Sequence, residues 1–135
     1  MKVFFYGLFM DADVLAKQGV VPESVSIGWV DDFVIQISQR ATMMREVGGR
    51  VYGTLMDVNA GDLKGLYAEE SVADYVAETV CVKLEGGGQA DAACYNLPQE
   101  KIVGKNKEYA KQLLKLASRL SFPKSYTEQI MRASR

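Results

Sequence analysis

Four residues after Asn59 share the spacing of one helical face, and one of them is a carboxylate. In NAGDLKGLYAEES the positions i, i+3, i+4 and i+7 are Leu63, Leu66, Tyr67 and Glu70. If the helix is continuous, Glu69 points about 100° away and toward water, at ~3.6 residues per turn. A carboxylate among apolar side chains is protonated more readily than one in water, which suits proton transfer near neutrality. The spacing therefore predicts Glu70 as a candidate general acid/base.

A structural interpretation of Glu70 also stays open. Helix ends fray, and Gly61 and Gly65 weaken this segment, so the side chain could extend from a last turn into solvent. Carboxylates with structural roles outnumber catalytic ones. The spacing alone does not decide between the two interpretations.

A glycine in FFYGLFM raises a second question. The apolar residues 3–6 predict a buried strand, and Gly7 interrupts it. A glycine at such a place marks a bulge, a sharp turn or a close approach of another group to the backbone. We therefore expect Gly7 to lie where something contacts the main chain.

Composition narrows the class of protein. The chain has 135 residues and the amino-acid composition of an ordinary globular protein. This predicts one domain over 1–135, with a hydrophobic core large enough to fold without disulfides or a metal. Sixteen basic and seventeen acidic residues leave a net charge of −1, which argues against nucleic-acid and membrane partners. There is no histidine, so histidine-dependent catalysis and histidine-containing zinc sites are excluded. No signal peptide or membrane-spanning segment is expected, which predicts a cytoplasmic location. In that reducing compartment Cys81 and Cys94 are expected to be free thiols.

About six strands and three helices are expected to position these residues. Gly86–Gly88 predicts a hairpin connection, and Asp31–Asp32 a turn between two strands. The expected strands are 3–6, 25–29, 33–37, 50–56, 75–84 and 90–97. One helix follows Asn59, a second follows the N-cap candidate Asn106, and a capping box at 125–128 predicts the third. On pattern alone Tyr109 belongs to the core, although its hydroxyl could reach a neighbouring cleft.

The order of several short motifs resembles the gamma-glutamylcyclotransferase-like family almost from end to end. The matching segments are Tyr6-Gly7, Ala41-Thr42-Met43, Val51-Tyr52-Gly53, Leu66–Glu70, Tyr75, Tyr95, Lys107-Glu108-Tyr109 and Ser121-Phe122-Pro123. The resemblance implies an α+β fold, a compact mixed β-barrel with flanking helices. It also implies that a small gamma-glutamyl amide is converted to 5-oxoproline and a free amine without a cofactor or metal.

The resemblance also implies site residues. Glu70 matches the family's proton acceptor, in agreement with the helical-face argument. Backbone amides after the first strand would bind substrate, here those of Tyr6, Gly7, Leu8, Phe9 and Met10. Tyr109 matches a tyrosine that contacts substrate. Arg40 and Arg45 are better explained as residues of a solvated loop than as ligands of an anion.

Two positions depart from the family pattern. Leu8 stands where serine is usual, and Tyr67 stands where aspartate is common before the glutamate. The first change removes a hydroxyl from the turn and leaves its amides in place. The alternative to an enzyme is therefore a non-catalytic module on the same fold that binds a small acidic metabolite or a partner protein, as a sensor or accessory module. In either case the protein is expected to be a monomer or a homodimer.

Overall fold

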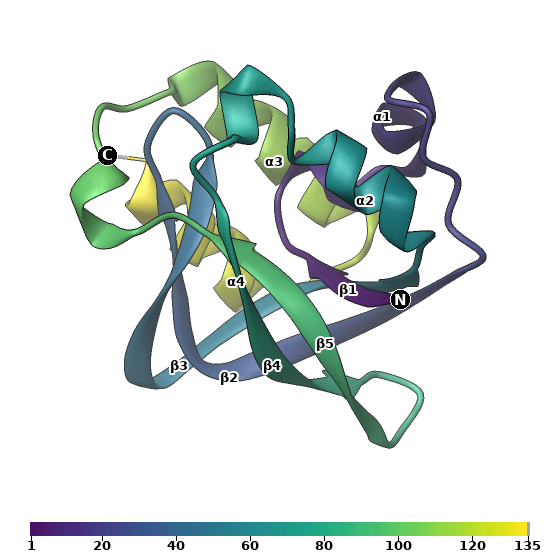
Figure 1. Cartoon of the computed structure of the whole chain (residues 1–135). Coiled ribbons are helices and arrows are strands. Elements are labelled where there is room, and N and C mark those ends of the chain that lie inside the picture. Colours follow the sequence, from purple (N-terminus) through teal and green to yellow (C-terminus); the bar gives the residue numbers. More distant parts are fainter. Residues whose placement is uncertain (135) are drawn as a thin grey trace.

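Five strands close into a barrel in the computed structural model, which describes residues 1–134. The strands are β1 (Lys2–Phe5), β2 (Ser24–Ile37), β3 (Ala41–Asp57), β4 (Val76–Leu84) and β5 (Gln89–Asn96). Their order around the barrel is β1-β3-β2-β4-β5, and a parallel contact between β1 and β5 closes it. All other neighbours are antiparallel. The expected α+β barrel is confirmed (Figure 1).

The barrel has five strands because residues 24–37 form one strand. Asp31–Asp32 was expected to be a turn, and it is instead a β-bulge in the pairing of β2 with β3. Asp32 adopts a positive φ of 64°, which an aspartate tolerates better than most residues. The N–H of Gly48 on β3 donates to Asp32 Oδ1 at 3.0 Å and stabilises the bulge.

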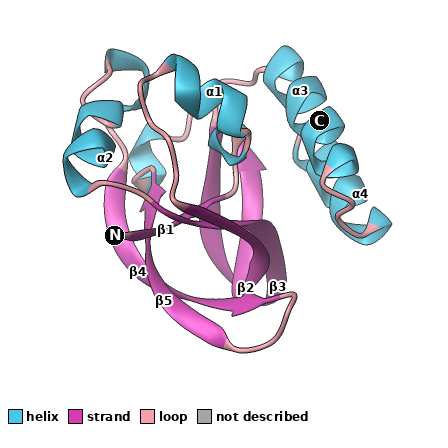
Figure 2. Ribbon diagram, turned by 90° about the vertical axis from the view of Figure 1, so that its right-hand side faces the viewer, coloured by secondary structure: helices cyan, strands magenta, loops and turns pink. Residues whose placement is uncertain are grey.

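Four α-helices and three short 3-10 turns connect and flank the strands. The helices are α1 (Ala12–Lys17), α2 (Ala60–Leu66), α3 (Lys107–Arg119) and α4 (Lys124–Ala133). The 3-10 turns are η1 (Leu8–Met10), η2 (Glu70–Val72) and η3 (Gln99–Lys101). Figure 2 shows α3 and α4 as a pair along one side of the barrel, away from α1 and α2. The sequence patterns did not predict α1.

Two of the expected helix starts are confirmed, and one is wrong. The side chain of Asn59 accepts hydrogen bonds from Gly61 N and Asp62 N, and that of Asn106 accepts from Tyr109 N. Both satisfy amides that a helix start leaves without a partner. The expected capping box at 125–128 does not form, because α4 begins at Lys124 directly after Pro123. Pro123 is itself the N-cap residue, and its carbonyl oxygen accepts the first helical bonds, from Tyr126 N at 2.9 Å and Thr127 N at 3.2 Å.

One hydrophobic core fills the barrel and continues beneath the helical pair. Inside the barrel, Val3, Met56, Val82 and Cys94 have no exposed surface. The same holds for Leu113 of α3 and Ile130 of α4. Within residues 1–134, no helix is both long enough and apolar enough to cross a membrane.

Candidate functional site

The turn after β1 forms one wall of a small cavity of about 30 Å³. Its other walls come from the start of β3, the segment after α2, β5 and the start of α3. Five residues expected to contact substrate line it: Tyr6, Gly7, Leu8, Phe9 and Tyr109. Met10, the sixth, is buried in the core instead. We call this space the inner cavity.

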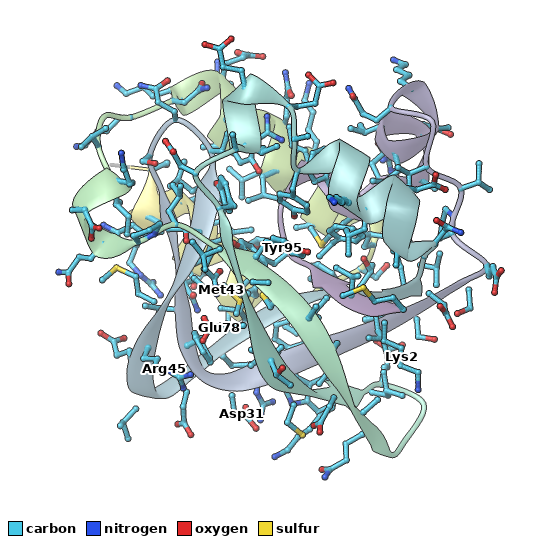
Figure 3. All side chains as sticks on the ribbon, viewed as in Figure 1. Lys2, Asp31, Met43, Arg45, Glu78 and Tyr95 are labelled. Carbon is cyan, nitrogen blue, oxygen red and sulfur yellow. The ribbon has the colours of Figure 1, made fainter. Side chains whose placement is uncertain are left out.

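Aromatic side chains form most of the wall of the inner cavity. The ring of Tyr67 stacks on that of Tyr95, with centroids 3.9 Å apart and planes 9° apart. The ring of Phe9 meets Tyr67 edge-on at 6.0 Å. Figure 3 shows Tyr95 on the helix side of the barrel, toward α2. A cavity of 30 Å³ has room for about one water molecule, so the inner cavity in this structure does not hold a whole substrate.

Burial raises the pKa of four tyrosines of this site. It raises the pKa of the Tyr6 and Tyr67 hydroxyls well above the ordinary value, and that of Tyr109 as well. The pKa of Tyr75 is raised for the same reason, and its hydroxyl donates to the carbonyl oxygen of Ala41. Neutral phenols donate and accept hydrogen bonds but do not serve as bases at neutral pH.

What approaches Gly7 is the hydroxyl of Tyr109. A Cβ at position 7 would lie 2.5 Å from Tyr109 Oη, which leaves no room for a side chain. The same oxygen accepts the N–H of Leu8 at 3.2 Å, and Gly7 O accepts the N–H of Met10 at 3.0 Å. Two of the five amides expected to bind substrate are thus already bonded. No hydrogen bond among residues 1–134 uses the N–H of Gly7 or Phe9.

A polar network lies behind the inner cavity. The hydroxyl of Tyr6 is 2.7 Å from both Asn96 Oδ1 and the Tyr95 carbonyl oxygen, and Met43 N donates to Asn96 Oδ1 at 3.1 Å. Asn96 Nδ2 donates to Glu78 Oε1 at 2.6 Å, and Arg45 pairs with Glu78 at 3.1 Å. Figure 3 shows Arg45 and Glu78 farther from α2 than Tyr95. The network holds Tyr6 in place from behind.

A second cleft of about 160 Å³ adjoins the inner cavity. Four residues border both spaces: Leu8, Phe9, Arg40 and Val72. The cleft also has Glu69 and Ser71 in its wall, which are the two chain neighbours of Glu70. We call this space the outer cleft.

The expected setting of Glu70 is wrong. Helix α2 ends at Leu66, where the Tyr67 N–H bonds back to Leu63 O, and Glu70 begins the separate 3-10 turn η2. Glu70 is therefore solvent-exposed and does not continue the face formed by Leu63 and Leu66. The physical reason is the break in helical geometry, because i+7 spacing aligns side chains only along an unbroken helix. Glu69, expected to point away, borders the outer cleft.

Arg40 lies in the turn between β2 and β3, where it is half-buried and borders both the inner cavity and the outer cleft. The sequence favoured a solvated loop over contact with an anion for this residue, and it did not predict this partial burial beside the cavity. Arg45 does lie at the surface, as expected, and pairs with Glu78. The site thus combines a cation, two amides without partners, neutral phenols and a carboxylate-bearing turn, a set of groups suited to a small anionic molecule.

Comparison with solved structures shows what fold this is. A structure named gamma-glutamyl cyclotransferase matches with a TM-score of 0.78 and 19% identity, over 100% of this chain and 88% of that chain. An uncharacterized protein from Homo sapiens matches with a TM-score of 0.73 and 20% identity, over 99% and 87%. YkqA from Bacillus subtilis matches with a TM-score of 0.78 and 22% identity, over 98% and 53%. At such identities the likeness shows the fold alone.

Sequence comparison supplies the family. No curated protein sequence matches the chain. The model of the AIG2-like family matches residues 50–130, which include the second part of β3, the turn with Glu70, and α3. This match covers more than half of the chain and agrees with the barrel and its helical pair. The chain therefore belongs to the AIG2-like family, with the gamma-glutamylcyclotransferase-like fold.

Proposed function

We propose that the protein is a cyclotransferase that converts a small gamma-glutamyl amide, of an amino acid or an amine, into 5-oxoproline and the free amine. The observation that carries the proposal is a carboxylate-bearing turn, Glu69–Ser71, beside a cleft of about 160 Å³ next to the turn after β1. A cavity of roughly 150 Å³ accepts a ligand the size of benzene. The product, a five-membered lactam, is of similar size. The matched structure named gamma-glutamyl cyclotransferase supports the same reaction.

The reaction needs little chemical apparatus. The α-ammonium of the gamma-glutamyl group loses a proton to a carboxylate, and the freed nitrogen attacks the side-chain amide carbonyl carbon. The attacking nitrogen then loses its second proton, the bond from the carbon to the departing nitrogen breaks, and the departing amine takes up both protons, one of them from the carboxylic acid. Because ring closure is intramolecular, holding the substrate folded supplies much of the acceleration. In this proposal the amides of Gly7 and Phe9, which line the inner cavity and have no partner among residues 1–134, donate to the developing oxyanion.

Glu70 is the proposed acid/base. It lies between Glu69 and Ser71, which both border the outer cleft. To act on the substrate, its side chain has to rotate toward the cleft. In the free protein Glu70 is exposed, so the proposal includes this rotation on binding. Catalytic contacts are often loose in unliganded structures and form only with substrate present.

A panel of gamma-glutamyl compounds tests the proposal directly. The wild-type protein is incubated with each compound, and 5-oxoproline is measured. We expect Glu70→Gln to lower kcat by roughly a hundredfold or more, the usual contribution of a general acid/base. Glu69→Gln is the matched control, one residue away and with the same change of charge, and it should retain most of the activity. Loss only in Glu69→Gln assigns the proton transfer to Glu69; absence of 5-oxoproline from every compound contradicts the proposed reaction.

The second candidate is a binding module without turnover. The exposure of Glu70 and the small volume of the inner cavity favour it. A ligand that binds only the folded state raises the unfolding temperature by mass action. For a binding module, stabilisation by a gamma-glutamyl compound persists during incubation and no 5-oxoproline forms. For an enzyme, the stabilisation changes as substrate is converted.

A further inference from the structure

Arg40 is held in place by the turn that joins β2 to β3. Ser38 N donates to the carbonyl oxygen of Arg40 at 2.9 Å, and Ser38 Oγ also contacts this oxygen, at 3.4 Å. Ser38 is itself buried, so the backbone of this turn is anchored in the core. The Arg40 side chain therefore starts from a fixed position at the rim of the barrel.

The guanidinium of Arg40 lies over two aromatic rings. Its Cζ is 5.1 Å from the centroid of Phe9 and 5.6 Å from that of Tyr109. Both rings belong to the wall of the inner cavity. Cation–π contacts of this kind orient a guanidinium and cover its faces, but they leave the N–H groups at its edge free for a planar acceptor.

No carboxylate among residues 1–134 forms an ion pair with Arg40. Three other arginines do have acidic partners, although their side chains are largely exposed: Arg45 at 72%, Arg50 at 46% and Arg119 at 65%. A half-buried cation without a partner is costly, whereas an exposed one is solvated by water. Among the arginines that the structure describes, Arg40 thus has the greatest electrostatic need for an anion, and it borders the candidate site.

The groups around Arg40 define what kind of anion fits. Glu69 is the carboxylate that shares the outer cleft, while the neighbouring Tyr75 and Tyr109 are neutral. The Phe9 amide, on the same side, has no partner among residues 1–134. A small carboxylate can accept two parallel N–H bonds from a guanidinium. A bulky or multiply charged anion would crowd a cleft of about 160 Å³ and meet the Glu69 carboxylate.

We infer that Arg40 binds the α-carboxylate of the gamma-glutamyl group and is the specificity-determining residue that selects substrates carrying it. The inference rests on the proposed function. The carboxylate of the substrate becomes the carboxylate of 5-oxoproline, so the same contact persists in the product. This permits a test by binding alone, with no turnover required.

The test compares two lactams that differ only in the carboxylate, 5-oxoproline and 2-pyrrolidinone. Binding of each is measured by calorimetry at constant ionic strength, with wild type, Arg40→Met, Arg40→Lys and the matched control Arg45→Met. We expect wild type and Arg45→Met to bind 5-oxoproline more tightly than the neutral lactam. Arg40→Met should weaken the binding of 5-oxoproline roughly tenfold or more and leave the affinity for 2-pyrrolidinone unchanged. Arg40→Lys, which keeps the charge and loses the paired N–H groups, should fall between.

The outcomes separate this inference from the proposed reaction. Selective weakening of 5-oxoproline supports the role of Arg40 even if the protein turns over no substrate. Equal binding of 5-oxoproline by wild type and a folded Arg40→Met contradicts it, even if the protein is a cyclotransferase. The inference about Arg40 is also contradicted if the wild-type protein binds neither lactam, or binds both with equal affinity. Circular dichroism and urea unfolding establish that each variant is folded, and Arg40→Lys replaces Arg40→Met if the latter is not.

Discussion

The hydroxyl of Tyr109 lies against the backbone of Gly7, although the two residues are a hundred positions apart. It accepts the N–H of Leu8 at 3.2 Å and occupies the space that a Cβ at position 7 would need. The backbone of Gly7 has a φ of −102°, which any residue can adopt. Glycine is thus required at position 7 by close packing and not by conformation.

Gly7→Ala should lower the free energy of unfolding by about 1–3 kcal/mol, because Tyr109 is buried and cannot move aside freely. The double variant Gly7→Ala/Tyr109→Phe tests the cause, since the next atom of Tyr109 would be 3.8 Å from the new Cβ. We expect the double variant to be less destabilised than the sum of the single variants. Urea unfolding followed by the fluorescence of Trp29 measures this coupling, and strict additivity contradicts it.

Asn96→Asp should destabilise the barrel in a way that depends on pH. It replaces the amide that donates to Glu78 by a carboxylate, so that two acidic groups meet at a buried position. We expect a loss of about 3 kcal/mol at neutral pH. Burial and the like charge raise the pKa of the new carboxyl in the folded state, so the loss grows as pH rises above the unfolded pKa of about 4. Adding Glu78→Gln should recover part of the loss, and failure to do so argues against direct repulsion.

Tyr67→Ala should cost about 3 kcal/mol, because it removes the ring stacked on Tyr95 and leaves a void. Tyr67→Phe is the matched control. The hydroxyl of Tyr67 forms no hydrogen bond within residues 1–134, so its removal should change stability by less than about 1 kcal/mol. Guanidinium unfolding of the two variants measures both effects. A large loss in Tyr67→Phe would show that the hydroxyl, and not the stacked ring, carries the stability.

Asp31→Asn should be destabilising at neutral pH and nearly neutral in acid. The hydrogen bond from Lys83, together with Arg50, lowers the pKa of Asp31 below its ordinary value of 3.8, against the opposing effect of burial. A carboxyl with a lowered folded-state pKa stabilises the fold above the unfolded value, and this contribution is lost as pH falls through the folded value. Urea unfolding at pH 7 and at progressively lower pH should show the gap between variant and wild type closing.

Asp91→Asn is the control for this experiment. Asp91 lies on β5 and is exposed, and it forms no ion pair within residues 1–134. Its substitution removes the same charge without disrupting a network of paired charges. A pH dependence as large in Asp91→Asn as in Asp31→Asn would trace the effect to net charge.

Local patterns predicted much of the fold. The helix starts after Asn59 and Asn106 were predicted correctly, and in both cases the asparagine side chain bonds to amides two or three residues away. The bulge at Asp32 was misread as a turn, since a turn and a bulge both require the unusual backbone that aspartate tolerates. Helix α1 was missed because it is short, with Leu15 as its single buried residue and no apolar repeat.

The candidate site, like the fold, was predicted only in part from the sequence. From the sequence alone, the order of motifs determined the family, and Gly7 was recognisable as a place of close approach. Only the tertiary structure decided that Tyr109 is the group that approaches, that α2 ends before Glu70, and that Arg40 faces the cavity. The physical reason is the distance along the chain over which the interactions act. Spacing and capping express interactions within a few residues, whereas burial and charge at the site depend on segments that meet only when the barrel closes.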